Sequence, residues 1–245
     1  MTNWCRRLGN ALLEVLLPVV CRACGETVSF ATRGAPVDGL RWCDAPVLCR
    51  DCAARVLTPA PLVGIIGADD IEVTACGGMP TCAELVDVVS AWKYHGRRGL
   101  AWPLAELAGQ AWDLAVATGG EVDRLVPVPL HGRRLRERGF NQADVLARLL
   151  GQARGVAVSP DLARRTRATA QQAKLASRRE VRDHNVRGVF AARARSDGEA
   201  GRVGLIDDLV TSGATATALA ASLDAAGWHV SWVLAPGLAT DRQYT

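Results

Sequence analysis

A short run of acidic and hydroxyl-bearing residues in the C-terminal third has the composition of a sugar phosphate site. The apolar residues 203–206 are followed directly by Asp207 and Asp208, and the sequence Thr-Ser-Gly-Ala-Thr follows at residues 211–215. Gly213 would let a backbone come close to a phosphate, and the start of a following helix offers free amides with a favourable dipole. Adjacent carboxylates can accept hydrogen bonds from vicinal sugar hydroxyls. The segment therefore predicts a ribose 5-phosphate site.

Each half of that predicted site has its own residues. The ribose hydroxyls are assigned to the two carboxylates, and the 5-phosphate is assigned to Thr211, Ser212, Gly213, Ala214 and Thr215. A structural alternative stays open, in which the aspartates merely end a strand and Thr211 or Ser212 merely caps a helix.

Paired cysteines near the N-terminus have the spacing of metal ligands. Cys21 and Cys24 form one Cys-x-x-Cys pair, and Cys49 and Cys52 form a second. Four thiolates at this spacing suit tetrahedral zinc, and the sequence predicts a structural zinc site on these four residues. Cys43 lies between the pairs and could replace one ligand. Redox use of the pairs is the rival, but it needs a thioredoxin-like setting that this region lacks.

Basic residues gather in two segments of the chain. The first holds Arg133, Arg134, Arg136 and Arg138, and the second runs from residue 164 to residue 187. Such clusters form local positive patches whose guanidinium groups could bind an anionic group. The alternative for any single arginine is a solvated face or an ion pair.

Together these motifs resemble the ComF family, which includes GntX and is related to the type I phosphoribosyltransferases. The resemblance rests on residues 203–215, on residues 126–130 and 138–142, on the cysteine pairs, and on the series Gln171, Leu175, Arg179, Asn185 and Phe190. It implies a protein that binds phosphoribosyl pyrophosphate with magnesium and transfers the phosphoribosyl group to an unidentified acceptor. It also implies a role in competence and DNA uptake inside the cell.

The same resemblance implies where the other half of the donor would bind. A pyrophosphate loop would follow the first core strand at residues 130–134, and a mobile loop within residues 166–179 would close over the site and exclude water. The residues expected there are Leu130, Arg133, Arg134, Arg138, Gln171, Lys174 and Arg178. Residues 75–79 depart from the family pattern, which leaves the acceptor open, whereas Lys93 matches a family lysine whose role is undefined.

Strand-like and helix-like segments alternate in an order that predicts an α/β fold. Residues 85–92 and 100–116 have helical spacing, residues 125–129 indicate a strand that passes into a loop, and Asn141 can cap a helix that runs to residue 150. Residues 203–206 and 229–234 indicate strands on either side of a helix that runs from residue 211 to residue 227. This order predicts a parallel sheet with flanking helices, the type I phosphoribosyltransferase fold. The expected domains are an N-terminal helix and zinc module (1–61), a connector (62–79) and the phosphoribosyltransferase-like domain (80–245).

Composition also bears on the location of the protein. The hydrophobic residues 11–20 are interrupted by Glu14 and Pro18 and are too few to span a bilayer, so a cytoplasmic protein without membrane insertion is expected.

The alternative to an enzyme is a catalytically silent protein. It would sense phosphoribosyl pyrophosphate, or it would handle single-stranded DNA or a competence helicase during transformation. A net charge of only +4 does not by itself demand nucleic acid.

Overall fold

The computed structural model describes residues 21, 25–27, 59–68, 71–94, 98–166 and 188–239. They fall into two compact units, of which the first comprises Met1–Thr58 with Cys82–Leu100 and the second Pro59–Thr81 with Ala101–Thr245. Both divisions differ from the expected boundaries at residues 61 and 79. Residues 59–81 belong to the larger unit, and the segment after them belongs to the smaller one.

In the smaller unit, the described residues after position 81 form one helix and a short turn of 3-10 helix. α3 spans Ala83–Tyr94 and η2 spans Arg98–Leu100. The buried side chains of α3 recur at helical spacing: Leu85, Val88, Val89, Ala91 and Trp92. Lys93 lies in the last turn, where a cation complements the negative end of the helix dipole.

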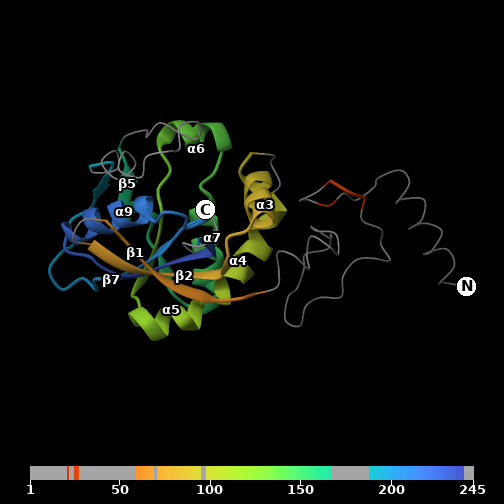
Figure 1. Ribbon diagram of the computed structural model, residues 1–245. Helices are drawn as coiled ribbons and strands as arrows, with labels where there is room; N and C mark the ends of the chain where they lie inside the picture. Colours follow the sequence, from red (N-terminus) through yellow and green to blue (C-terminus); the bar gives the residue numbers. More distant parts are fainter. Residues whose placement is uncertain are drawn as a thin grey trace, which may run out of the picture. The chain divides into compact units, whose positions relative to one another are not determined.

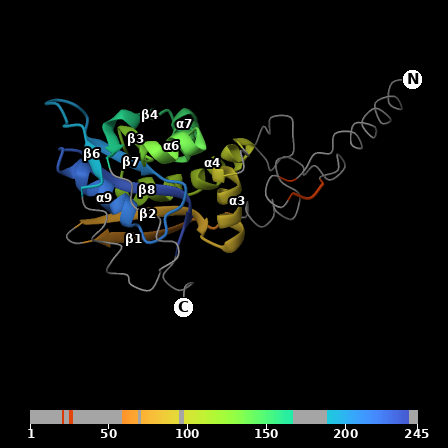
Figure 2. The same cartoon turned by 90° about the horizontal axis from the view of Figure 1, so that it is seen from above.

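The larger unit is built on a six-stranded sheet with the order β1-β2-β8-β7-β3-β4 (Figures 1 and 2). Its strands are β1 (Leu62–Ala68), β2 (Ile71–Pro80), β8 (His229–Leu238), β7 (Arg202–Ile206), β3 (Arg124–Pro127) and β4 (Ala157–Val158). β1 pairs antiparallel with β2, and every other pair in this sheet is parallel. The expected parallel α/β sheet is confirmed, but the expected connector is instead two of its strands.

Helices cover both faces of this sheet. α4 (Ala101–Gly109), α5 (Trp112–Gly119) and α7 (Gln142–Arg154) pack on one face, and α9 (Ala214–Asp224) packs on the other, as Figure 1 shows for α5 and α9. The alternation of side chains along β8 matches this layering. Trp232 contacts Trp112 of α5 at 5.4 Å between ring centroids, whereas Val233 and Ala235 belong to the core cluster that contains the buried face of α9.

The chain breaks the helical segment expected at residues 100–116 into two. α4 ends at Gly109 and α5 begins at Trp112. α4 packs against α7, β2 and β8, while α5 packs against β1, β2 and β8. One straight helix could not cover both regions, so tertiary packing overrides a locally continuous apolar pattern.

A small antiparallel ribbon lies outside the main sheet. β5 (Ala163–Arg165) follows the short η3 (Pro160–Leu162) and pairs with β6 (Phe190–Ala192), with Arg165 opposite Phe190. β6 packs against α9. The expected mobile loop lies between these two strands, and except for Thr166 its residues 166–179 lie outside the described residues.

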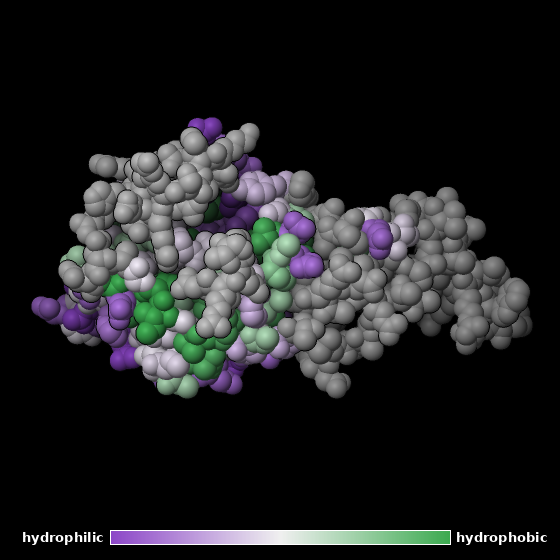
Figure 3. All heavy atoms as spheres, in the orientation of Figure 1, coloured by the Kyte–Doolittle hydropathy of each residue, from purple (hydrophilic) through white to green (hydrophobic). Residues whose placement is uncertain are grey.

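No helix among the described residues is long and apolar enough to cross a membrane. The space-filling view shows apolar side chains at the surface of the face that it presents (Figure 3). Val63 and Ile65 of β1 are among the exposed large apolar side chains, at 46% and 72%.

Candidate functional site at the carboxyl ends of the strands

The carboxyl ends of β3 and β7 lie side by side in the middle of the sheet. Pro127 is the register partner of Ile206, and the amide of Val128 donates to the carbonyl of Ile206 at 2.9 Å. After β3 the chain leads to β4 on one side, and after β7 it leads to β8 on the other. In open parallel sheets, ligands bind at such a point, where successive connections leave in opposite directions.

Asp207 and Asp208 emerge from β7 at this point on a main chain that is held by hydrogen bonds. The amide of Asp207 donates to the carbonyl of Leu234 at 3.1 Å, and the amide of Asp208 donates to the Asp207 carboxylate at 2.8 Å. Val210 returns to β8, where it pairs with Leu238. Both aspartates are half-buried, so their side chains are partly accessible to solvent.

The N-terminus of α9 follows at once. The helix begins at Ala214, and its N-cap residue is Gly213, which offers no side chain to the helix amides. Neither Thr211 nor Ser212 caps the helix, and both are exposed. Within the described part of the chain, the amides of residues 211–216 donate to no carbonyl or side chain. An eleven-residue helix with uncapped amides is a favourable place for an anion.

Gly213 is required for a reason that the sequence does not show. Its φ is +74°, and a Cβ placed there would lie 2.6 Å from the Cβ of Ile66 in β1. Positive φ and contact with a buried side chain already exclude other residues at this position. The glycine is therefore explained by packing against β1, whether or not a phosphate approaches it.

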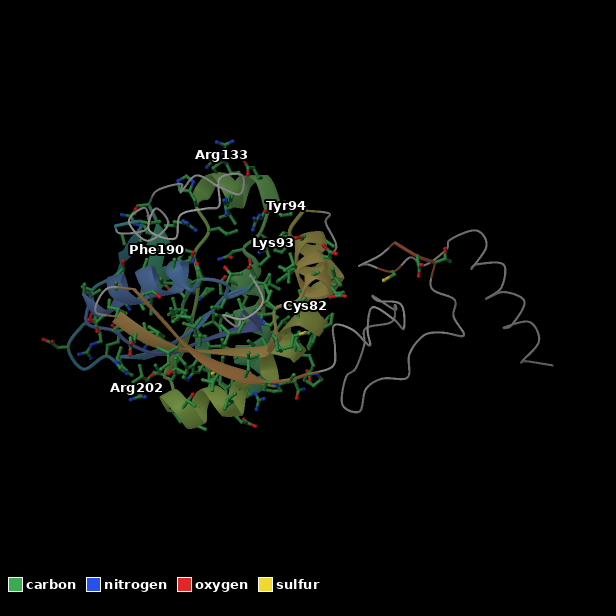
Figure 4. The ribbon with its side chains drawn as sticks, viewed as in Figure 1. Cys82, Lys93, Tyr94, Arg133, Phe190 and Arg202 are labelled. Carbon is green, nitrogen blue, oxygen red and sulfur yellow. The ribbon has the colours of Figure 1, made fainter. Side chains whose placement is uncertain are left out.

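The first arginine cluster lies on a helix rather than in the expected loop. α6 spans Gly132–Arg138, and helical spacing divides its arginines between two sides. Arg133 is exposed, and its Nε donates to Glu137 at 2.9 Å; Figure 4 shows it at the outer surface of α6. Arg136 is also exposed, whereas Arg134 and Arg138, four residues apart, are half-buried.

Arg165 of β5 belongs to the second basic segment, but the sequence analysis did not assign it individually to the site. Burial lowers the pKa of its guanidinium, the positive charge of Arg134 lowers it further, and the carboxylate of Asp207 raises it. Its guanidinium carbon also lies 5.4 Å from the centre of the Phe190 ring, which Figure 4 labels. Two cations that repel each other beside a carboxylate make a place where an anion relieves the repulsion. Alternation along β5 could have indicated it, because Arg164 is exposed and Arg165 is half-buried.

Only one of the predicted zinc ligands falls in the described part of the chain. Cys21 is buried and sits in a tight turn, in which its amide donates to the carbonyl of Glu26 at 2.6 Å and its carbonyl accepts from the amide of Gly25 at 3.0 Å. This turn suits a Cys-x-x-Cys knuckle followed by glycine. Cys24, Cys49 and Cys52 lie outside the described residues, and the remaining described residues offer no cluster of three metal-ligating side chains.

Other predicted residues are placed as follows. Leu130 is half-buried in the segment between β3 and α6, beside the carboxyl end of β3. Lys93 lies in α3 of the smaller unit. Gln171, Lys174 and Arg178 lie outside the described residues, so their place in the site stays a prediction.

Comparison with known proteins gives relatives but no matching family model. The DNA utilization protein YhgH of Salmonella typhimurium is 30% identical over 203 residues, which are 82% of each chain. Competence protein F of Haemophilus influenzae is 31% identical over 94 residues, 38% of this chain and 40% of that protein. A solved structure, orotate phosphoribosyltransferase from Aeropyrum pernix, shares 13% identity with a TM-score of 0.28, over 73% of this chain and 88% of that one. The chain belongs to the family of the DNA utilization protein YhgH, the ComF/GntX family that its motifs resemble.

Proposed function

We propose that the protein binds phosphoribosyl pyrophosphate at the carboxyl ends of β3 and β7 and transfers its phosphoribosyl group to an unidentified acceptor. The observation that carries this proposal is the meeting, at one point of the sheet, of two aspartates, an uncapped helix N-terminus and half-buried arginines. Each group has a counterpart in the donor. The proposed fold is that of a type I phosphoribosyltransferase, supported by the mostly parallel sheet and by the sequence of residues 203–215.

The donor would lie across this edge of the sheet, and each of its polar groups would meet protein groups of complementary charge or hydrogen-bonding capacity. Asp207 and Asp208 would accept hydrogen bonds from the ribose hydroxyls, and the amides of residues 211–215 would donate to the 5-phosphate. Arg134, Arg138 and Arg165 would face the pyrophosphate, since they are half-buried and come from elements at the same edge.

Magnesium fits the donor set of this site. Hard oxygen ligands would come from the pyrophosphate, with Asp207 and Asp208 as the carboxylates at this edge. Bound there, the ion would neutralise negative charge that develops on the departing pyrophosphate. The arginines would share that task by donating to oxygens of the same group.

The two sides of α6 allow a test with matched loss of charge. The double variant Arg134→Ala with Arg138→Ala removes the half-buried pair, and Arg133→Ala with Arg136→Ala removes the exposed pair. We expect calorimetry with the magnesium complex of phosphoribosyl pyrophosphate to show a loss of about 30-fold or more for the first variant and little change for the second. Ribose 5-phosphate, which lacks pyrophosphate, should bind both variants like the wild type.

Equal weakening by both variants would mean that the arginines act only through the overall field, and the pyrophosphate placement would be wrong. A wild-type protein that does not bind phosphoribosyl pyrophosphate would refute the proposal itself. Release of pyrophosphate in a screen of nucleobases and other small acceptors would separate transfer from binding alone.

A second candidate function is DNA handling without catalysis, and two observations favour it. Arg133 and Arg136 are exposed on the outer side of α6, and relatives are named for DNA use and competence. If this function holds, single-stranded DNA should bind with a steep salt dependence, and the exposed-pair variant should reduce the slope. The binding should persist in the double variant Asp207→Asn with Asp208→Asn. A donor-sensing protein would instead bind phosphoribosyl pyrophosphate without turnover.

A further inference from the structure

Asn141 joins the start of α7 to the segment that follows β3. Its Oδ1 accepts from the amide of Ala143 at 3.2 Å and caps the helix, and its Nδ2 donates to the carbonyl of Val128 at 3.1 Å. Val128 in turn donates to the carbonyl of Ile206, the residue before Asp207. One side chain therefore links the helix, the segment after β3 and the start of the aspartate loop.

Gln142, the next residue, accepts a hydrogen bond from the side chain of Arg138 in α6. It is fully buried, and its Oε1 accepts from Nη1 of Arg138 at 3.2 Å. Its Nε2 is buried and finds no hydrogen-bond partner in the described part of the chain. A buried amide nitrogen left without an acceptor costs stability, so an apolar side chain of similar size would suit this position better if folding alone decided it.

The oxygen and the nitrogen of the Gln142 side-chain amide differ in their hydrogen bonding, and this difference suggests a functional rather than a structural role for the residue. Its oxygen is used on a half-buried arginine, while its nitrogen carries a cost that the fold does not recover. Residues that reduce stability without a packing benefit are typical of functional sites.

We propose that the first residues of α7 position the pyrophosphate half of the donor site, Gln142 by orienting the Arg138 guanidinium and Asn141 by fixing the main chain after β3. Neither residue needs to touch the ligand. The inference rests on the proposed donor binding, because it states how that subsite is held in place. It names two positioning residues that would act through Arg138 and through Val128.

The test of Gln142 uses stability and binding together. Gln142→Met keeps the volume and removes both amide atoms, so the melting temperature should stay the same or rise. The dissociation constant for magnesium phosphoribosyl pyrophosphate should nevertheless increase about 3- to 10-fold, as loss of one oriented hydrogen bond to a charged group implies. Affinity for ribose 5-phosphate should not change. A merely structural glutamine would lose stability on substitution and would weaken both ligands alike, which would overturn the proposal.

A double-mutant cycle shows whether Gln142 acts through Arg138. In an Arg138→Ala background, Gln142→Met should cause no further loss of donor affinity, because the guanidinium that it orients is gone. Additive losses would contradict the inference. Trp228→Phe is the matched control: it deletes one side-chain hydrogen bond to a carbonyl, from Nε1 to Arg193 at 2.7 Å, in a residue that this inference does not involve. That variant should lower stability and leave donor affinity unchanged.

The role of Asn141 can be tested by a measurement that needs no ligand. Asn141→Ser keeps a helix-capping oxygen and loses the donation to Val128. Hydrogen exchange should therefore speed up at the amide of Val128, which donates to Ile206, but not in β8. Donor affinity should fall while ribose 5-phosphate affinity holds. Unchanged exchange at Val128 would overturn the role given to Asn141. Failure of the wild type to bind the donor would instead refute the proposed function, and with it the role given to Gln142.

Discussion

At the residue scale, Arg133 and Arg134 are adjacent in sequence yet have different surroundings. Arg133 is exposed and paired with Glu137, whereas Arg134 is half-buried and its charge acts on Arg165. An exposed ion pair of this kind contributes little to stability. The candidate site therefore depends on which side of α6 a charge occupies rather than on the number of arginines in the segment.

The carboxylates are tested by Asp207→Asn combined with Asp208→Asn. Donor affinity should fall by roughly 2–4 kcal/mol, since charge-assisted hydrogen bonds are worth about 1.5–3 kcal/mol each and are rarely additive. The fold should survive, because an asparagine at position 207 keeps the oxygen that accepts from the amide of Asp208. Calorimetry that finds wild-type affinity in the folded variant would exclude the ribose assignment.

Glu199 provides a prediction about pH. Hydrogen bonding by Arg193, at 2.7 Å from Nη2 to Oε1, holds the pKa of the Glu199 carboxyl below its usual range. A carboxyl with a lowered folded-state pKa stabilises the protein above its ordinary value of about 4.3 and loses that contribution as pH falls through the lower value. The stability difference between wild type and Glu199→Gln should therefore be full near pH 6 and shrink towards pH 3. Urea denaturation over this range measures it, and a constant difference would contradict the linkage.

At the element scale, the antiparallel strand β1 determines where α9 can begin, because it packs against the N-cap residue of that helix. Ile66 of β1 lies against Gly213, at the point where α9 begins. α9 packs against β1, β2 and β8 of the sheet. The start of α9 is therefore set by a strand, Leu62–Ala68, that lies far earlier in the chain.

Gly213→Ala should destabilise the fold by about 2–4 kcal/mol, because a left-handed backbone costs roughly 1–2 kcal/mol and the added methyl must displace Ile66. Gly155→Ala is the matched control. Gly155 also has positive φ, +69°, but a Cβ there meets nothing within 4 Å, so this variant should lose only the backbone part. Equal losses in urea denaturation would show that Ile66 yields without cost.

At the scale of the whole molecule, the two units differ in what holds them together. The larger unit has a continuous hydrophobic cluster formed by strands of the sheet and the buried face of α9. For the N-terminal region, the sequence offers paired cysteines instead, and Cys21 already sits in a tight turn. We propose that zinc on Cys21, Cys24, Cys49 and Cys52 supplies the stability of that region.

Freshly purified protein should carry about one zinc ion per chain by elemental analysis. Changing any of the four cysteines to serine should remove the zinc and unfold the N-terminal region first. Limited proteolysis should leave the sheet of the larger unit protected, including β1 and β2. Cys76→Ser is a suitable control, because Cys76 lies in β2 and is not in a paired motif. Protein without zinc, prepared without chelators, would refute the assignment.

The sequence alone determined the local features of this protein. Three features follow from turn chemistry, capping preferences and side-chain periodicity: the strand that ends at Ile206, the capping of α7 by Asn141 and the short strand before Val128. The likeness to the ComF family also came from such local motifs, and relatives confirm it. Helix ends were less accurate, since α9 begins at Ala214 rather than at Thr211.

Only the tertiary structure decided which distant segments meet. Residues 62–80 became part of the sheet, and the predicted helix was interrupted after Gly109. The arginines of α6 were divided between two sides, and Arg165 came close enough to Asp207 for the carboxylate to raise its pKa. Local periodicity indicates which way Arg165 and the arginines of α6 face, but it does not determine these outcomes, because each depends on which surfaces pack together across long stretches of chain. Periodicity fixes the direction that a side chain takes from its own element, but the partner that it meets there is chosen by the packing of the whole unit.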